Sequence, residues 1–472
     1  MRKIIGRERE QKILREAVES NRPEFIAVYG RRRIGKTYLI RNFFHGEFDF
    51  YMSGSYNAPM KEQLENFHIQ LEIYSHRAWE KPTSWRQAFR QLQDYLSSLK
   101  KDKIIIFFDE LPWLDTPKSR FIGVLELFWN GWADWNDNVK FIVCGSATTW
   151  MTHKLIGNKG GLHNRITHQL YLAPFNLRET EMMLDWTGVK WNRHQIVECY
   201  MAVGGVPYYL SKMSKGLSLA QNIDQLFFRD KAELKIEYNT LFRSLFNNSE
   251  IYRQVVALLA TKTRGMTRME IRKSLQLSDG GKLTEVLNNL MTCDFIREYT
   301  AFGRKKRGSL FQLTDLYTLF YLKQVKDIKN VTGDYWSTRI DSPSHRAWSG
   351  YAFEQVCLHH IHQIKEALGI NGIESAVYSW TADDDGKRKA QIDLIIDRRD
   401  EVINLCEMKF SIAPFNITPQ YLKTLIERRE FFRETTGTRK ALHLTFVTLN
   451  GVVHNEQWNM IQNEVMADAL FR

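Results

Sequence analysis

Residues 24–37 read EFIAVYGRRRIGKT, and the expected architecture follows from this stretch. Its first six residues form a short apolar run typical of a buried parallel strand. Its last eight match the spacing G-x-x-x-x-G-K-S/T. A loop of this kind, placed between a strand and a helix, surrounds phosphates with backbone N–H groups, and Gly30 and Gly35 permit the close approach. The stretch therefore predicts an ATP-binding loop in a P-loop NTPase fold.

A second apolar run, at residues 103–108, ends at an acidic pair. Lys36 is expected to reach the β and γ phosphates of ATP, and the Thr37 hydroxyl to hold Mg²⁺. Asp109 is expected to be the carboxylate on the metal side, and Glu110 the base that orients the attacking water. The nucleotide-binding residues expected in and after the loop are Gly30, Arg31, Arg32, Arg33, Ile34, Gly35, Lys36, Thr37 and Tyr38.

Two further polar residues are candidates for the same site. Ser146 follows the apolar run at residues 140–144 and is expected to sense or position the γ phosphate, although a turn serine fits the pattern equally well. Arg165 is a candidate for stabilising the developing charge, either within its own chain or from a neighbouring subunit. A surface salt bridge is the alternative for Arg165.

Length and composition limit the classes of protein to which the chain can belong. A chain of 472 residues exceeds one compact core, so roughly two to four domains are expected. The formal charge of +12 favours acidic partners such as DNA or nucleotide. Five cysteines without C-x-x-C pairing argue against a disulfide framework or a structural zinc. With neither a secretory signal nor an apolar stretch long enough for a bilayer, the chain is expected to be soluble and cytoplasmic.

The pattern of apolar runs divides the chain into expected domains. Residues 1–175 alternate strand and helix, which is typical of an open parallel sheet with crossover helices. Residues 176–245 are expected to form a helical lid, and residues 246–325 a winged helix, because short helices are followed by a hairpin. Residues 326–345 are expected to be a connector, and residues 346–472 a separate α/β domain.

The expected winged helix has features that suit DNA. Residues Thr267 to Glu270 match a capping box that starts one helix, and Gly281 begins the next, which would be the recognition helix. The hairpin tip at residues 304–307 is basic, and such cations contact phosphates without reading sequence. DNA is therefore an expected partner; a solvated tip on a module that packs within the chain is the alternative.

Polar residues occur on apolar strands of the last expected domain. Asp393 lies in AQIDLIID, and Glu407 and Lys409 lie in LCEMKF, on strands expected to be adjacent. Two carboxylates can hold Mg²⁺ on a scissile phosphate, and a lysine two residues further on points to the same face and can position water. Glu354, in the helix around YAFEQV, completes the pattern. The histidines within residues 359–362 are expected to form a packed or solvated face rather than a metal site.

Several of these motifs together resemble a known family. The Gly-Arg-Glu start at residues 6–8, GRRRIGKT, FFDELPWL, CGSATTW, the His-Asn-Arg segment and GGVPYYL are similar to the prokaryotic archaeal-type ATPases, a branch of the AAA/STAND-like P-loop NTPases. The resemblance implies that Arg7 lies near the adenine. It also implies that Pro207 belongs to a lid over the nucleotide, with a mere helix break as the alternative.

The C-terminal pattern carries a second resemblance. Glu354, Asp393, Glu407 and Lys409 look like the site of the restriction-endonuclease-like PD-(D/E)xK fold, which is usually fused to these ATPases. The expected fold class is therefore α/β multidomain, with a P-loop NTPase parallel sheet, a helical lid, a winged helix and a C-terminal restriction-endonuclease-like α/β domain.

Three functions fit this organisation. The leading hypothesis is an ATP-binding and ATP-hydrolysing switch that controls a Mg²⁺-dependent DNA nuclease-like domain. The alternative is an ATP-dependent regulator that binds DNA or a protein partner and has a catalytically silent C-terminal domain. A third hypothesis is a ring-forming motor in which Arg165 serves the neighbouring subunit. We expect a monomer or a weak oligomer, and no membrane partner.

Overall fold

The structure is a computed structural model of the chain. It describes residues 3–472 apart from 247, 279, 304–307, 329–333 and 384–387. The basic hairpin tip predicted to contact DNA therefore lies outside the described residues. Two compact units divide between Ala173 and Pro174, two residues before the predicted end of the ATPase core.

The first unit is built on a parallel sheet of five strands in the order β2-β3-β4-β1-β5. The strands are β1 (Glu24–Tyr29), β2 (Phe50–Ser53), β3 (Ile104–Asp109), β4 (Val139–Gly145) and β5 (His168–Tyr171). The three apolar runs singled out by sequence are β1, β3 and β4. The sequence pattern misses β2 and β5 because each is a four-residue edge strand that is only partly buried.

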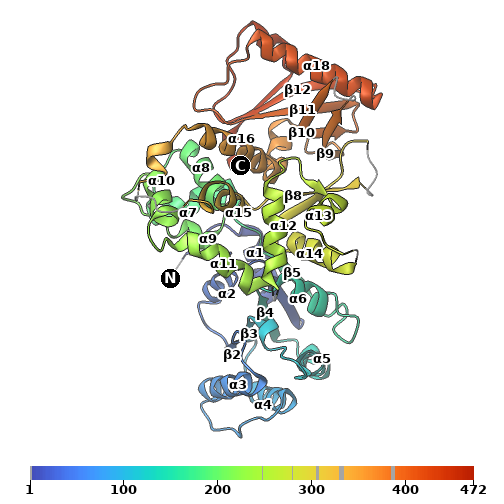
Figure 1. Cartoon of the computed structure of the whole chain (residues 1–472). Helices are drawn as coiled ribbons and strands as arrows, with labels where there is room; N and C mark the ends of the chain where they lie inside the picture. Colours follow the sequence, from blue (N-terminus) through green and yellow to red (C-terminus); the bar gives the residue numbers. More distant parts are fainter. Residues whose placement is uncertain (1–2, 247, 279, 304–307, 329–333, 384–387) are drawn as a thin grey trace. The chain divides into compact units, whose positions relative to one another are not determined.

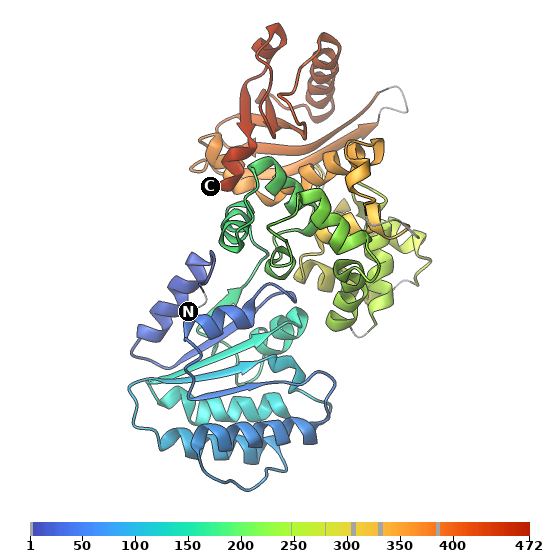
Figure 2. The same cartoon turned by 90° about the vertical axis from the view of Figure 1, so that its left-hand side faces the viewer.

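Helices cover both faces of this sheet (Figure 2). They are α1 (Glu8–Glu19), α2 (Lys36–Phe43), α3 (Met60–Ser75), α4 (Trp85–Ser97), α5 (Phe121–Gly131) and α6 (Thr148–Trp150), with short turns η1 (Leu111–Trp113), η2 (Ala133–Trp135) and η3 (Met151–Ile156). Alternate residues of β1 enter different cores: Phe25 packs with α3, α4 and α5, whereas Ile26 packs with α1 and α2. This two-sided burial explains why the strand is a continuous apolar run.

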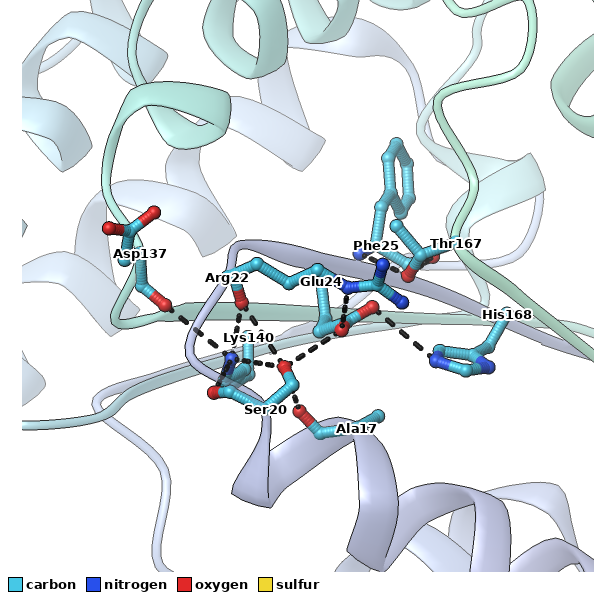
Figure 3. A network of polar contacts seen from close by, with 9 residues as sticks. All are labelled: Ala17, Ser20, Arg22, Glu24, Phe25, Asp137, Lys140, Thr167 and His168. Carbon is cyan, nitrogen blue, oxygen red and sulfur yellow. Dashed lines mark hydrogen bonds and ion pairs between the residues drawn. The ribbon is translucent and has the colours of Figure 1, made fainter.

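The amino-terminal edge of the sheet is held by a buried polar network (Figure 3). Lys140 on β4 is fully buried, and its Nζ donates to the carbonyl oxygens of Ser20 and Arg22. Its register partner on β1, Glu24, is also fully buried and accepts from Ser20 Oγ at 2.8 Å. Burial raises the pKa of Glu24, but hydrogen bonds from Thr167, Arg22 and Ser20 outweigh it and leave the pKa below its ordinary value. The network explains why two charged residues, Lys140 and Glu24, lie on otherwise apolar strands. It lies at the opposite end of these strands from the phosphate-binding loop.

The second unit begins with helices (Figure 1). They are α7 (Leu177–Thr187), α8 (Arg193–Val203), α9 (Pro207–Leu210), α10 (Leu219–Ile223), η4 (Asp224–Phe228) and α11 (Glu233–Leu245). A small module follows, with α12 (Ser249–Ala260), β6 (Met266–Thr267), α13 (Arg268–Ser274), α14 (Gly281–Thr292), β7 (Ile296–Tyr299) and β8 (Leu310–Leu313). Its antiparallel sheet has the order β6-β8-β7, and Thr267 and Glu270 form the expected capping box.

A second, mixed sheet lies at the C-terminal end of this unit. The connecting elements are α15 (Leu316–Phe320), η6 (Tyr321–Val325), η7 (Ser337–Arg339), α16 (Pro343–His359) and α17 (Ile361–Ala367). The sheet elements are β9 (Ser375–Asp383), β10 (Lys389–Arg398), β11 (Val402–Lys409), α18 (Pro419–Thr436), β12 (Ala441–Thr448), η8 (Glu456–Met460), β13 (Asn463–Met466) and η9 (Ala467–Phe471). The strand order is β13-β12-β11-β10-β9, with β11, β12 and β13 parallel and the β9–β10–β11 meander antiparallel.

Two findings bear on the expected class of protein. In the part of the chain that the structure describes, no helix combines the length and apolar character needed to cross a membrane. All five cysteines are buried free thiols, as expected from their spacing.

Candidate functional site

The phosphate-binding loop connects β1 to α2, and its geometry depends on glycine. Gly30 has a φ of 144° and Gly35 a φ of 88°, which side chains disfavour. A Cβ atom on Gly30 would lie 2.4 Å from the carbonyl oxygen of Leu172. Residue 30 therefore has no room for a side chain. The helix begins at Lys36, directly after Gly35, and a helix N-terminus favours an anion.

The side chains of the loop are held mostly inward. Lys36 is only 5 % exposed, and its Nζ donates to the carbonyl oxygens of Gly30 at 2.9 Å and Arg31 at 3.0 Å. Arg31 and Ile34 are buried, whereas Arg32, Arg33 and Thr37 are partly buried. Tyr38 is exposed, and its hydroxyl donates to the carbonyl of Lys3 at 3.0 Å.

The carboxylate at the end of β3 lies against the loop. Thr37 Oγ1 donates to Asp109 Oδ2 at 2.8 Å, so the two residues predicted to act around Mg²⁺ are in direct contact. Asp109 is 4 % exposed, and this burial, helped by the charge of Glu110, raises its pKa although the bond from Thr37 opposes the rise. A divalent cation at this carboxylate would favour its ionised form.

The backbone turns at Glu110, directly after the end of β3. Its φ of 47° is in the left-handed region, which is uncommon for a side-chain-bearing residue and is a feature of functional sites. The carboxylate accepts the Ser146 N–H at Oε2, at 3.0 Å, and the Ser146 hydroxyl at Oε1. The residue expected to contact the γ phosphate is therefore bonded to the candidate base, across the neighbouring ends of β3 and β4.

Arg7 is tied to the end of the first unit. Its Nη2 donates to the carbonyl oxygens of Ala173 at 2.7 Å and of Ile34, in the loop, at 3.5 Å. Its φ of 59° places the residue in the left-handed region just before α1. The side chain is 6 % exposed. Arg7 thus fixes the chain start beside the phosphate-binding loop, and a contact with adenine stays a prediction.

Four predicted residues lie near one another, three on strands of the C-terminal sheet and one on α16. Lys409 Nζ lies 2.7 Å from Glu407 Oε1 on the same strand, two residues away. Asp393 falls at an irregularity in the β9–β10 pairing, where one extra residue is inserted between Ile392 and Ile395. Such bulges re-aim a side chain next to functional sites. Glu354 comes from α16, which packs against β11.

The carboxylates of this cluster are in different protonation environments. Burial, with the nearby charges of Asp393 and Glu407, raises the pKa of Glu354 to about 9. Burial also raises the pKa of Asp393. Burial acts in the same direction on Glu407, but the charges of Lys409 and Arg428 outweigh it and hold the pKa below its ordinary value. At neutral pH the cluster thus contains an ionised Glu407 and a protonated Glu354.

Residues 4–213 match a family described as an ATPase domain predominantly from Archaea. This part of the chain is therefore similar to an ATPase domain of archaeal type. The match spans the first unit and continues through α9. The uncharacterized protein MJECL04 of Methanocaldococcus jannaschii is 26% identical over 366 residues, which cover 75% of this chain and 76% of that protein.

The solved structures that align with this chain include proteins of Pyrococcus abyssi and Aeropyrum pernix. The Walker-type ATPase PABY2304 of Pyrococcus abyssi has a TM-score of 0.49 at 18% identity, and the alignment covers 68% of this chain and 96% of that chain. The Aeropyrum pernix ORC2 protein, in ADPNP–ADP complexes, has a TM-score of 0.42 at 15% identity, with 67% and 93% covered.

Two residues predicted to act at the nucleotide site, Arg165 and Pro207, lie apart from the loop. Arg165 forms a half-exposed ion pair with Asp134 at 3.0 Å. Both residues precede the starts of their strands, β5 and β4, at the edge of the parallel sheet opposite the phosphate-binding loop. Topology therefore disfavours action of Arg165 within its own chain. Pro207 belongs to the second unit, where it begins α9, so its place in a lid stays a prediction.

The first unit has donors that fit Mg²⁺. Thr37 and Asp109 supply a hydroxyl and a carboxylate in contact, and Mg²⁺ usually takes one or two such ligands plus phosphates and waters. The C-terminal cluster also offers hard oxygen donors, but both Glu407 oxygens already have partners. No group of three or more His, Cys, Asp or Glu among the described residues is arranged to hold a metal.

Sequence reasoning missed the α18 residues of the C-terminal cluster. Tyr421 Oη donates to Glu407 Oε1 at 2.5 Å, and Arg428 Nη1 donates to Glu407 Oε2 at 2.7 Å. They are seven residues apart on one helix, hence on one face, and this spacing is the signal that was present. Gln391, which donates to Asp393 Oδ1 at 2.5 Å, is two residues before it on β10.

The histidines within residues 359–362 divide between a packed ring, His360, and two exposed residues, His359 and His362. His360 is fully buried; its Nε2 accepts the N–H of Leu177 at 3.1 Å, and its Nδ1 bonds the carbonyl of Val356 at 2.8 Å. Burial lowers the pKa of His360 to about 4, so the ring is neutral. Both ring nitrogens are engaged, which leaves neither for a metal.

Proposed function

We propose that the chain is an ATP-hydrolysing switch that controls a Mg²⁺-dependent DNA nuclease-like domain. The observation that carries this proposal is the C-terminal cluster, in which Glu354, Asp393, Glu407 and Lys409 meet although they come from three elements. Carboxylates with separated pKa values beside a lysine suit acid–base chemistry at a phosphodiester. The archaeal-type ATPase domain supplies the nucleotide-dependent part.

In the nucleotide site, the roles follow from the contacts. Lys36 exchanges its bonds to loop carbonyls for bonds to phosphate oxygens, and Thr37 and Asp109 would hold Mg²⁺, which neutralises phosphate charge when bound. Glu110 orients the attacking water once Ser146 releases it. The bond between Ser146 and Glu110 therefore keeps the base inactive until a nucleotide changes the γ-phosphate end of the site.

In the C-terminal site, Asp393 and Glu407 would hold Mg²⁺, which polarises the scissile phosphate when bound. Lys409 positions the attacking water. Glu354 retains its proton at neutral pH because its pKa is about 9, so it is suited to give a proton to the leaving oxygen. The product ends would then be a phosphate and a hydroxyl.

Cleavage of plasmid and linear DNA with Mg²⁺ tests this proposal. The native protein should cut, and Glu407→Ala and Lys409→Ala should each lose most of the activity. Lys36→Ala should keep the C-terminal site intact but lose the response of cleavage to ATP. Equal cleavage by all of these variants would refute the nuclease assignment and point to a contaminant.

A second candidate function is an ATP-dependent regulator that binds DNA or a protein partner and whose C-terminal domain is silent. It is favoured by the engagement of Glu407, whose two oxygens are bound by Lys409, Tyr421 and Arg428. In that case the affinity for DNA depends on the bound nucleotide, and Glu407→Ala leaves this affinity unchanged. A filter-binding titration with ATP and with ADP separates the two candidates.

A further inference from the structure

The hairpin of β7 and β8 is continuous with the C-terminal sheet. Beyond the end of β7, Ala301 forms a parallel bridge with Ser379 of β9, and the Phe302 N–H donates to the Ser379 carbonyl at 2.7 Å. Strand β9 is the edge of the mixed sheet, and an edge strand exposes unpaired backbone groups. The hairpin therefore covers part of this edge.

Aromatic packing seals the same junction. The Phe302 ring lies 5.4 Å from the Tyr378 ring and 5.1 Å from the Phe432 ring, measured between centroids. Both contacts belong to the hydrophobic core of the C-terminal sheet, against which Phe302 packs. The junction is thus built like a domain interior rather than a loose surface contact, and the hairpin holds a fixed position beside the sheet.

Arg297 on β7 is held beside the carboxylate cluster. Its Nε and Nη2 both donate to Gln312 Oε1, at 2.8 Å and 2.6 Å, and its guanidinium lies 4.9 Å from the Tyr299 ring centre. Burial lowers the pKa of Arg297, while the charges of Tyr299, Tyr351 and Asp393 oppose this. The guanidinium and the Asp393 carboxylate are therefore close enough to interact electrostatically.

The helix that carries Glu354 is tied to the same point. Tyr351, one turn earlier on α16, donates from its hydroxyl to the carbonyl of Thr263 at 3.4 Å, and Gln312 Nε2 donates to that carbonyl at 2.5 Å. Hairpin, helix and sheet thus meet around Arg297. Among the described residues Arg297 makes no ion pair at contact distance, and its Nη1 has no hydrogen-bond acceptor, so one side of a rigid cation is available.

A positioned guanidinium without a carboxylate partner is a phosphate-binding group. Lys409 and Arg428 cannot fill this role, because Glu407 already engages both. We propose that strand β7 and the C-terminal carboxylate cluster form one nucleic-acid-binding site, in which Arg297 binds a backbone phosphate of the DNA strand presented to Asp393. This inference rests on the proposed function for the choice of DNA as ligand.

Fluorescence anisotropy with a short fluorescein-labelled DNA duplex tests the inference in the full chain. Ca²⁺ replaces Mg²⁺, so that binding is read without cleavage. Arg297→Gln should weaken binding about tenfold and reduce the slope of log affinity against log salt by about one, because one phosphate contact is lost. Arg297→Lys should recover part of the affinity. The matched control is Arg243→Gln, which removes an exposed arginine from α11 and should change neither quantity.

The outcomes separate this inference from the nuclease proposal. Unchanged affinity and salt slope in Arg297→Gln overturn the composite site, even when the native protein cleaves DNA. A weakened Arg297→Gln with partial rescue by Arg297→Lys supports it, even when no variant cleaves. A native protein that binds no duplex overturns it as well. If Arg297→Gln fails to fold by circular dichroism, Arg297→Lys alone decides, since a lysine keeps the charge but changes the phosphate geometry and should still alter affinity.

Discussion

Replacing Glu354 by glutamine should stabilise the C-terminal sheet at alkaline pH. The pKa of Glu354 is raised from 4.5 to about 9, so the folded state keeps a proton that the unfolded state loses between these values. Stability therefore falls as pH rises through this window. Glutamine resembles the protonated acid in shape and carries no titratable proton, so the stability of the variant does not fall as pH rises through this window.

The magnitude follows from the same pKa. At pH 8 the pH lies 3.5 units above the unfolded-state pKa of 4.5. At about 1.4 kcal/mol per unit, the native chain loses at most about 5 kcal/mol of stability by this pH. Glu354 is partly exposed, and solvent screens part of this, so we expect Glu354→Gln to gain about 2 kcal/mol over the native chain at pH 8. At pH 5 the two proteins should be within about 0.5 kcal/mol of each other.

Hydrogen exchange in urea, followed through peptides of α16 and β11, measures this locally, because a chain of two compact units need not unfold in one step. The matched control is Glu366→Gln on α17, an exposed glutamate whose replacement should add no pH dependence. If Glu354→Gln is equally destabilising at pH 5 and pH 8, Glu354 is ionised in the folded state and the reasoning about the cluster is wrong.

Three further outcomes are expected. Gly30→Ala should abolish binding of a fluorescent ATP analogue and lower stability by about 2 kcal/mol, because the new Cβ meets the Leu172 carbonyl at a strained φ. Ser146→Ala should raise the basal kcat for ATP about threefold with little change in KM, as read by phosphate release, because the hydroxyl that holds Glu110 inactive is lost; a lowered kcat would contradict this. Lys140→Met should cost about 3 kcal/mol in urea unfolding, because it removes one partner of a buried polar network; a neutral result would show that the network is dispensable.

The nucleotide site was largely predictable because its signals are local. A glycine-spaced loop after an apolar run fixes the positions of Gly30, Lys36 and Thr37 without reference to the rest of the chain. Asp109 follows from the rule that parallel strands end at one edge of the sheet. The bond between Ser146 and Glu110 did not follow, because it depends on the left-handed turn at Glu110.

The C-terminal site was predictable only in part, because only some of its contacts depend on local sequence. Two-residue periodicity brings Glu407 and Lys409 to one face of a strand, and the sequence shows it. Arg428 reaches Glu407 only because α18 folds back over the sheet. Arg297 reaches the cluster from the hairpin of a different module, through a junction at Ser379 that no local pattern encodes.

The charge distribution of the C-terminal cluster argues for a functional site over a structural ion-pair network. A structural network would leave each buried carboxylate matched by a cation, as Glu407 is by Lys409 and Arg428. Glu354 instead is partly buried near two other carboxylates, and its pKa of about 9 reflects an environment that opposes its charge. An alanine or leucine at that position would remove this cost to stability. A partly buried acid that costs stability, near a bulged aspartate and a paired glutamate, fits a group kept for its proton, and this supports the proposed nuclease-like role of the C-terminal cluster.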